Sequence, residues 1–104
     1  MIKVTVLYPN EEGKKFDHAY WTSTHLELVQ KLLGPMGLVK GEMEKGVSGT
    51  DPNAPAPFVA VGHLYFNTEE EVHTAFTSHA GEIIGDIANY TDIKPTFQIS
   101  ETLL

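Results

Sequence analysis

Hydrophobic and polar side chains alternate along residues 2–8 and 93–102. A period of two is typical of β-strands, in which successive side chains point to opposite faces of a sheet. Both segments are therefore predicted strands, as is 58–66, the most hydrophobic run, which we expect at the centre of a sheet and buried on both faces. The amphipathic segment 38–47, which contains two glycines, predicts a fourth strand at a sheet edge or bend.

Two other segments repeat their apolar residues at helical spacing, and the first is predicted to run over about 17–33. Phe16 and Asp17 have the order of a hydrophobic residue followed by an N-cap, whose side chain accepts a free backbone N–H. Gly34 and Pro35 supply the stop, because glycine tolerates a left-handed cap and proline cannot continue the hydrogen-bond ladder.

The second predicted helix spans about 68–79 and begins with Thr68 and Glu71 at the spacing of a capping box. Gly81 ends or interrupts it, and residues 82–88 can add a short turn of helix. The acidic residues 69–71 lie in its first turn, where carboxylates stabilise the helix dipole. We therefore interpret them as helix-start residues rather than as catalytic carboxylates.

The predicted elements follow the order β-α-β-β-α-β within one domain, 1–104. This order is the split β-α-β arrangement of an α+β, ferredoxin-like fold, with two helices on one face of a four-stranded antiparallel sheet. The proline-rich segment 48–57 lacks large apolar side chains and is predicted to be a surface loop. The other face of the sheet needs a cover, and a second copy of so short a chain can provide it.

The composition excludes several classes of reaction and of binding partner. The chain has no cysteine, which removes disulfides, thiolate nucleophiles and cysteine-ligated zinc. Its formal charge of −7 opposes nucleic-acid binding. No apolar run approaches the roughly 20 residues that span a bilayer, and the start of the chain does not resemble a signal peptide, so we expect a cytoplasmic protein without membrane contact.

The sheet face away from the helices mixes apolar and polar side chains. If Ile2, Val4 and Val6 pack on the helices, alternation turns the neighbouring side chains to the opposite face. That predicted face carries Thr5, Val61, His63, Tyr65, Gln98 and Ser100. It is too apolar for free water and too polar for a dry core, which fits a ligand cavity. Alternatively, a partner sheet satisfies these groups.

The first helix carries a histidine on its apolar side. At 100° per residue, Trp21, His25, Leu28 and Leu32 fall in one stripe, with Val29 beside it. His25 is either a core residue held by hydrogen bonds or an imidazole that exchanges a proton with a bound ligand. Tyr20 lies about 90° or more from this stripe, so it need not share a site with His25.

The remaining histidines give weaker signals. His18 lies two turns before His25, but two histidines without a nearby carboxylate make a poor metal site, so no metal is predicted. His73 and His79 are interpreted as solvated or helix-end residues. The chain has no P-loop, dinucleotide fingerprint, GxSxG or HExxH motif. The residues alone therefore predict a pocket with one or two acid–base groups.

Three stretches resemble the EthD family. The sequence FDHAYWTSTH at 16–25 is similar to the family signature of an Asp, a Tyr and a helical His, which is followed here by aliphatic residues. HLYF at 63–66 and NYTDIKPTFQISE at 89–101 resemble the family's third strand and C-terminal segment. One departure is Leu26-Glu27, which stands where the family often has a proline after the His.

The resemblance implies a homodimeric α+β barrel, in which the sheets of two subunits pack together and each subunit binds a small apolar or weakly polar organic molecule. The founding protein is associated with bacterial degradation of ethyl tert-butyl ether. The implied role is therefore in oxidative catabolism, without a cofactor. The match to the signature makes His25 the expected catalytic residue. The helix stripe and the open sheet face described above supply the expected substrate-binding set, Trp21, Thr5, Val61, His63, Tyr65 and Gln98.

The resemblance leaves the reaction open, because related barrels support several activities. One hypothesis is a cofactor-independent oxidoreductase of the monooxygenase kind, and another is an isomerase or dehydratase that transfers a proton through His25. A third is a non-catalytic carrier or accessory protein for an apolar intermediate. A fourth is haem binding through His25, His63 or His18.

Overall fold

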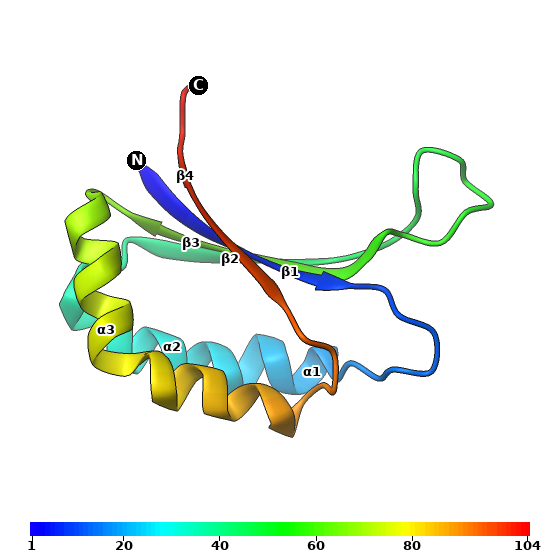
Figure 1. The fold of residues 1–104 in the computed structure, drawn as a ribbon, viewed down its shortest axis with the longest axis horizontal. Helices are drawn as coiled ribbons and strands as arrows, with labels where there is room; N and C mark the ends of the chain where they lie inside the picture. The colour runs from blue at the N-terminus through cyan, green and yellow to red at the C-terminus, as the bar shows by residue number, and fades with distance from the viewer.

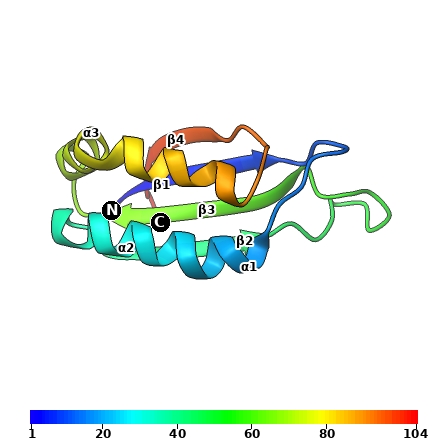
Figure 2. The same cartoon turned by 90° about the horizontal axis from the view of Figure 1, so that it is seen from below.

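The computed structural model of this chain describes residues 1–104. Four strands form one antiparallel sheet in the order β2-β3-β1-β4. The strands are β1 (Ile2–Pro9), β2 (Lys40–Lys45), β3 (Phe58–Phe66) and β4 (Thr96–Glu101). All the helices cover one face of this sheet, as Figures 1 and 2 show. The predicted α+β, ferredoxin-like fold is confirmed.

The sheet has one covered and one open face. Val4 and Tyr8 of β1 and Ala60 and Phe66 of β3 are buried against the helices, as their alternation predicts. Side chains of the opposite face, such as Val61, remain half-buried, so the expectation that β3 is buried on both faces does not hold within a single chain. Figure 1 shows the C-terminal segment and the loop after β2 rising on either side of this open face.

The first helical region contains an unexpected π turn. It consists of α1 (His18–Tyr20), the π turn Trp21–His25 and α2 (Leu26–Leu33). In the π turn the backbone N–H of Leu26 bonds the carbonyl of Trp21, five residues earlier. Asp17 caps the start of the region, as predicted, by accepting from the backbone N–H of Tyr20.

This π turn changes which side chains face the sheet. The buried residues are Trp21, His25, Val29 and Leu33, at a spacing of four, whereas Leu28 is only half-buried. A π turn holds about one residue more per turn than an α turn, so it rotates the following residues backward. Trp21 and His25 share the buried side as expected. Beyond them the most buried residues are Val29, which was expected beside the stripe, and Leu33, while Leu32 still packs against the core.

The second helix is longer than predicted. α3 spans Glu69–Asp86, and a 3-10 turn at Ile87–Asn89 follows. Gly81 does not end it, because glycine in a helix costs only about 1 kcal/mol. Burial of Ile83 in the next turn contributes about 1.5–3 kcal/mol, which outweighs that cost. No helix has the length and apolarity needed to cross a bilayer.

Candidate functional site

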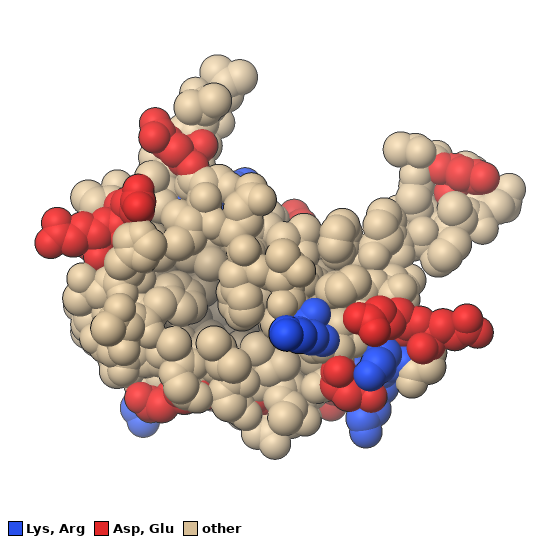
Figure 3. All heavy atoms as spheres, in the orientation of Figure 1, with Lys and Arg blue, Asp and Glu red and all other residues tan.

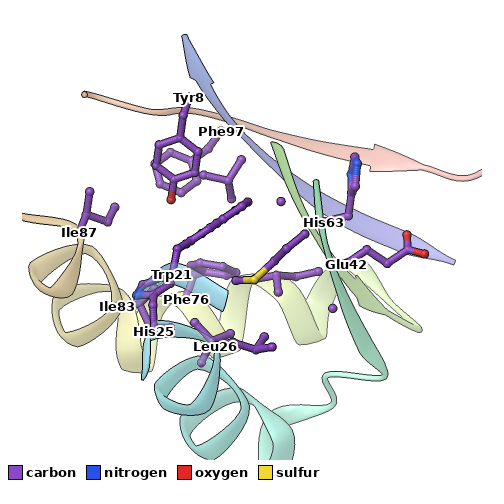
Figure 4. A pocket seen from close by; sticks show the side chains of 16 residues that line it. Tyr8, Trp21, His25, Leu26, Glu42, His63, Phe76, Ile83, Ile87 and Phe97 are labelled. Carbon is purple, nitrogen blue, oxygen red and sulfur yellow. The ribbon is translucent and has the colours of Figure 1, made fainter. Parts of the chain in front are cut away.

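A small cavity lies between the sheet and the helices. Its volume is about 40 Å³, and 11 of its 16 lining residues are hydrophobic. One water occupies about 10–15 Å³ of such a volume, so an organic ligand enters only when side chains move apart. Trp21 forms one wall, with its ring over β3, where a Cβ on Gly62 would come within 3.3 Å of it. The cavity is mostly apolar, with polar groups from Tyr8 and His25 on its walls (Figure 4).

His25 is held in one orientation by Asp86. The histidine ends the π turn and is only 5% exposed. Its Nδ1 lies 2.8 Å from Oδ2 of Asp86, the last residue of α3. An ionised carboxylate only accepts hydrogen bonds, so Nδ1 carries the hydrogen and donates it. The lone pair of the neutral ring is then on Nε2, which is free to accept a proton.

Asp86 is itself fixed by two further donors. Its Oδ1 accepts hydrogen bonds from the hydroxyl of Tyr20, at 2.8 Å, and from Nδ2 of Asn89, at 2.9 Å. Burial raises the pKa of Asp86, but the three hydrogen bonds that its carboxylate accepts outweigh burial and leave this pKa below its ordinary value. Asp86 therefore remains ionised, and it stabilises a positive charge on His25.

Two tyrosine hydroxyls extend this network. The hydroxyls of Tyr8 and Tyr90 are 2.6 Å apart, and the Tyr90 hydroxyl is 3.4 Å from Nε2 of His25. Burial raises the pKa of both tyrosines, so both remain neutral and can donate. The contact to Nε2 is longer than an ordinary hydrogen bond, so a ligand hydroxyl can replace it at small cost.

The structure divides the predicted site residues into two groups. His25 and Trp21 lie on the helix side of the sheet and line the cavity. His63 borders it from β3, but its ring bonds Thr5 at 3.2 Å on the opposite face. The other predicted residues on that opposite face are Val61, Tyr65 and Gln98.

The predicted substrate-binding set therefore does not gather around His25. The side chains of Tyr65, His63 and Gln98 lie on the other face of the sheet from the imidazole, because alternate residues of a strand point to opposite faces. Their own contacts form a second network, in which the Tyr65 hydroxyl donates to Glu42 at 2.7 Å and His63 Nε2 lies 3.3 Å from Glu44.

Sequence reasoning missed Asp86, Tyr90 and Tyr8. A helix continued through Gly81 would have brought Asp86 to the end of α3, beside the first helical region. Tyr90 belongs to the C-terminal segment that resembles the EthD family, and Tyr8 continues the helix-side face of β1. Tyr20 was expected to lie apart from His25, but its hydroxyl shares the carboxylate of Asp86.

The other histidines lie outside the cavity. His18 Nε2 bonds the carbonyl of Val59 at 3.1 Å, and its ring packs on Phe16. His73 pairs with Glu69 and His79 with Glu82 on the exposed side of α3. No group of three or more His, Cys, Asp or Glu residues is placed to hold a metal ion.

Comparison with known proteins finds relatives in the EthD family. The EthD domain model matches residues 11–94. A crystal structure of an EthD-like protein from Ralstonia eutropha is 44% identical, with a TM-score of 0.93 over 99% of this chain and 92% of that one. An EthD family protein from Bacillus halodurans is 20% identical, with a TM-score of 0.69 over 99% of both chains, and shows the same fold.

One relative can be aligned with this chain over the whole length of both proteins. It is an uncharacterised 11.0 kDa protein in the thcB–thcC intergenic region of Rhodococcus erythropolis, 27% identical over 100% of this chain and 99% of its own. A putative monooxygenase from Shewanella loihica has a TM-score of 0.62 at 8% identity, over 99% of this chain and 94% of that one, which is a likeness of fold alone.

Proposed function

Because the chain belongs to the EthD family, whose domain spans residues 11–94, we propose that it is a homodimeric, small-molecule-binding protein of oxidative catabolism. In this proposal each subunit holds an apolar organic ligand in the cavity between its sheet and helices. His25 accepts a proton from that ligand. Trp21 forms the apolar wall against which the ligand packs.

The observation that carries this proposal is the pair of His25, which is buried at the wall of an apolar cavity, and Asp86, which is largely buried behind it. A general base needs a free lone pair, a fixed orientation and a group that stabilises its charged form. Asp86 meets the last two needs through the 2.8 Å contact to Nδ1 and leaves Nε2 as the base. The apolar surroundings strengthen the attraction between the carboxylate of Asp86 and the positive charge that forms on His25.

The proton moves from an O–H or an acidic C–H bond of the ligand to Nε2, and the bonding electron pair stays on the ligand as an anion. If this anion takes the proton back at a different atom, the reaction is an isomerisation. If the anion of an activated CH₂ group reacts with dioxygen, the carbon becomes a carbonyl and the second oxygen atom leaves as water. Both routes use the same first step at His25.

The open face of the sheet is the proposed dimer surface. It carries half-buried apolar side chains, Leu7 and Val61, beside the network of His63 and Thr5. A monomer would leave these side chains in water, and the face of a second subunit would cover them. The set Thr5, Val61, His63, Tyr65 and Gln98 then belongs to the space between the two sheets.

The test begins with the ligand. Native mass spectrometry of protein purified from its own host identifies a retained molecule, which is then incubated with purified protein in air. We expect conversion by the wild type, and about 10²-fold or more slower turnover by His25→Gln. His79→Gln, which pairs with Glu82 on α3 and lines no cavity, is the matched control and should keep full turnover. Equal turnover by the two variants would remove His25 from the mechanism.

The same experiment separates catalysis from transport. A carrier or accessory protein would retain the molecule and return it unchanged, in the wild type as in both variants. Conversion by the purified wild-type protein alone excludes that alternative.

A further inference from the structure

Phe97 occupies an unusual position at the edge of the sheet. It lies on the helix-side face of β4, opposite Val6 of β1, and forms part of the cavity wall. A cavity-lining phenylalanine is expected to be buried, but Phe97 is 43% exposed. β4 pairs only with β1, so no further strand covers the outer side of this ring.

Two open hollows lie outside the cavity on this side of the molecule. One, of about 550 Å³, lies between the end of α3 and the segment that leads into β4, and Ile87 lines both it and the cavity. The other, of about 260 Å³, lies between α3 and β4, where Phe76 is shared with the cavity. Phe97 is the one residue that lines both hollows and the cavity. Its ring is therefore the wall between the inner cavity and the outside.

The surface around Phe97 suits an uncharged ligand. The hollow between α3 and β4 is lined mainly by hydrophobic side chains, among them Ile84 and Ile99, with His73 at its rim. Figure 3 shows that the charged side chains lie mostly around the edge of this view, while the area over α3 and β4 carries few. Lys94 and Asp92 mark the border of the other hollow.

We propose that Phe97 is the gate of the cavity and limits the size of the ligand that reaches His25. This inference rests on the proposed function, because it assumes that the cavity is the ligand site. The 40 Å³ cavity admits a ligand only when a wall moves. A half-exposed ring on an unpaired strand edge has free space on its outer side, so it can rotate outward without displacing a packed neighbour. The ligand class is an uncharged, apolar molecule that enters between α3 and β4.

Trp21 reports on this gate. It is the only tryptophan of the chain, is 2% exposed and lines the cavity. Acrylamide quenches tryptophan fluorescence on collision, so the quenching rate constant measures how readily a small uncharged molecule enters. We expect Phe97→Ala to raise the lifetime-corrected quenching constant several-fold over the wild type. Phe97→Leu keeps more of the packing and should give a smaller increase.

Two control variants make the result specific. Ile99→Ala shortens a side chain of the same strand and face, equally exposed at 43%, which lines only the outer hollow, so quenching should not change. Leu26→Ala opens the opposite wall of the cavity, beside β2, and should have a smaller effect than Phe97→Ala. Equal quenching in Phe97→Ala and Ile99→Ala would overturn the gate. A larger effect from Leu26→Ala would also overturn it, by moving the entrance to the α2 side.

Two further measurements distinguish an open gate from an unfolded variant. The melting temperature and far-ultraviolet circular dichroism of each variant are compared with the wild type, and Phe97→Leu replaces Phe97→Ala if the latter melts early. The quenching constant does not depend on proton transfer. Phe97→Ala is therefore expected to raise it by the same factor when His25→Gln is also present. A His25 variant with full turnover would contradict the proposed function but not the gate.

Discussion

At the scale of single residues, Asp86 couples the site to stability. Its folded-state pKa lies below the ordinary value, so the proton binds the unfolded chain more tightly. The carboxylate contributes stability above the unfolded-state pKa of about 4, and this contribution is lost as the pH falls through the folded-state pKa.

We therefore predict that Asp86→Asn flattens the acid side of the stability curve. Chemical denaturation at several pH values should show the unfolding free energy of the wild type falling below about pH 4, and falling less in the variant. At pH 7 the variant should lose about 1–3 kcal/mol, since a buried partner is left less well satisfied. Glu27→Gln, exposed on α2, is the control and should follow the wild type.

The four tyrosines give a second prediction at this scale. Burial raises the pKa of Tyr8 and Tyr90, and a hydrogen bond donated to a carboxylate raises that of Tyr20 and Tyr65. An ultraviolet titration should find fewer than half of them ionised at about pH 10, and about half once urea unfolds the chain. Raised pKa values add stability below about pH 10 that is lost at higher pH. A folded-state midpoint at the ordinary value would contradict the hydrogen-bond network.

Single residues also show where prediction from the sequence ends. Trp21 and His25 were placed on the buried side of their helix because helical spacing is a local property. Asp86 was missed because it lies 61 residues from His25 along the chain. Whether Asp86 comes close to His25 depends on where α3 ends. Gly81 was expected to end or interrupt that helix, so the true end at Asp86 was not predicted.

At the scale of elements, α3 depends on the capping box at its start. The side chain of Thr68 accepts the backbone N–H of Glu71, and Glu71 accepts that of Thr68. We predict that Thr68→Ala lowers the unfolding free energy by about 1 kcal/mol in urea denaturation. Thr74→Ala, exposed in the middle of the same helix, should change it little, because alanine is the better helix former. Equal losses would mean that the box does not stabilise the helix.

The elements were predictable to different degrees. Both helix starts and the four strands could be predicted from capping residues and alternation. The π turn could not, since no local residue pattern requires it. It turned Val29 and Leu33 fully inward and left Leu28 and Leu32 half-buried. The last strand begins at Thr96 rather than at 93, where Ile93 is instead buried in a loop against Tyr90 and Tyr8.

At the scale of the whole molecule, the sheet separates two polar networks. The network of His25 and Asp86 lies on the helix side, where His25 lines the cavity, and that of His63 and Thr5 lies on the open face. The mixed polarity of the open face was predictable from the sequence. Its interpretation as the lining of a ligand cavity stays a prediction, because the same pattern suits an interface between two subunits.

The proposed homodimer is tested on this open face. Analytical ultracentrifugation at micromolar concentration should find a dimer for the wild type and a weaker one for Val61→Glu, because that change places a charge between the two sheets. Thr77→Glu, exposed on α3, carries the same added charge away from the face and should remain dimeric. A wild-type monomer would contradict the proposal.

The central claim is that His25 accepts a proton from a molecule in the cavity, and 4-nitrophenol tests it most directly because its phenolate absorbs visible light. Binding is followed by quenching of Trp21, and protonation by absorbance, at a pH below the pKa of the free probe. We predict a phenolate band for the probe bound to the wild type, and binding without that band in His25→Gln. The same phenolate fraction in both proteins would contradict the account.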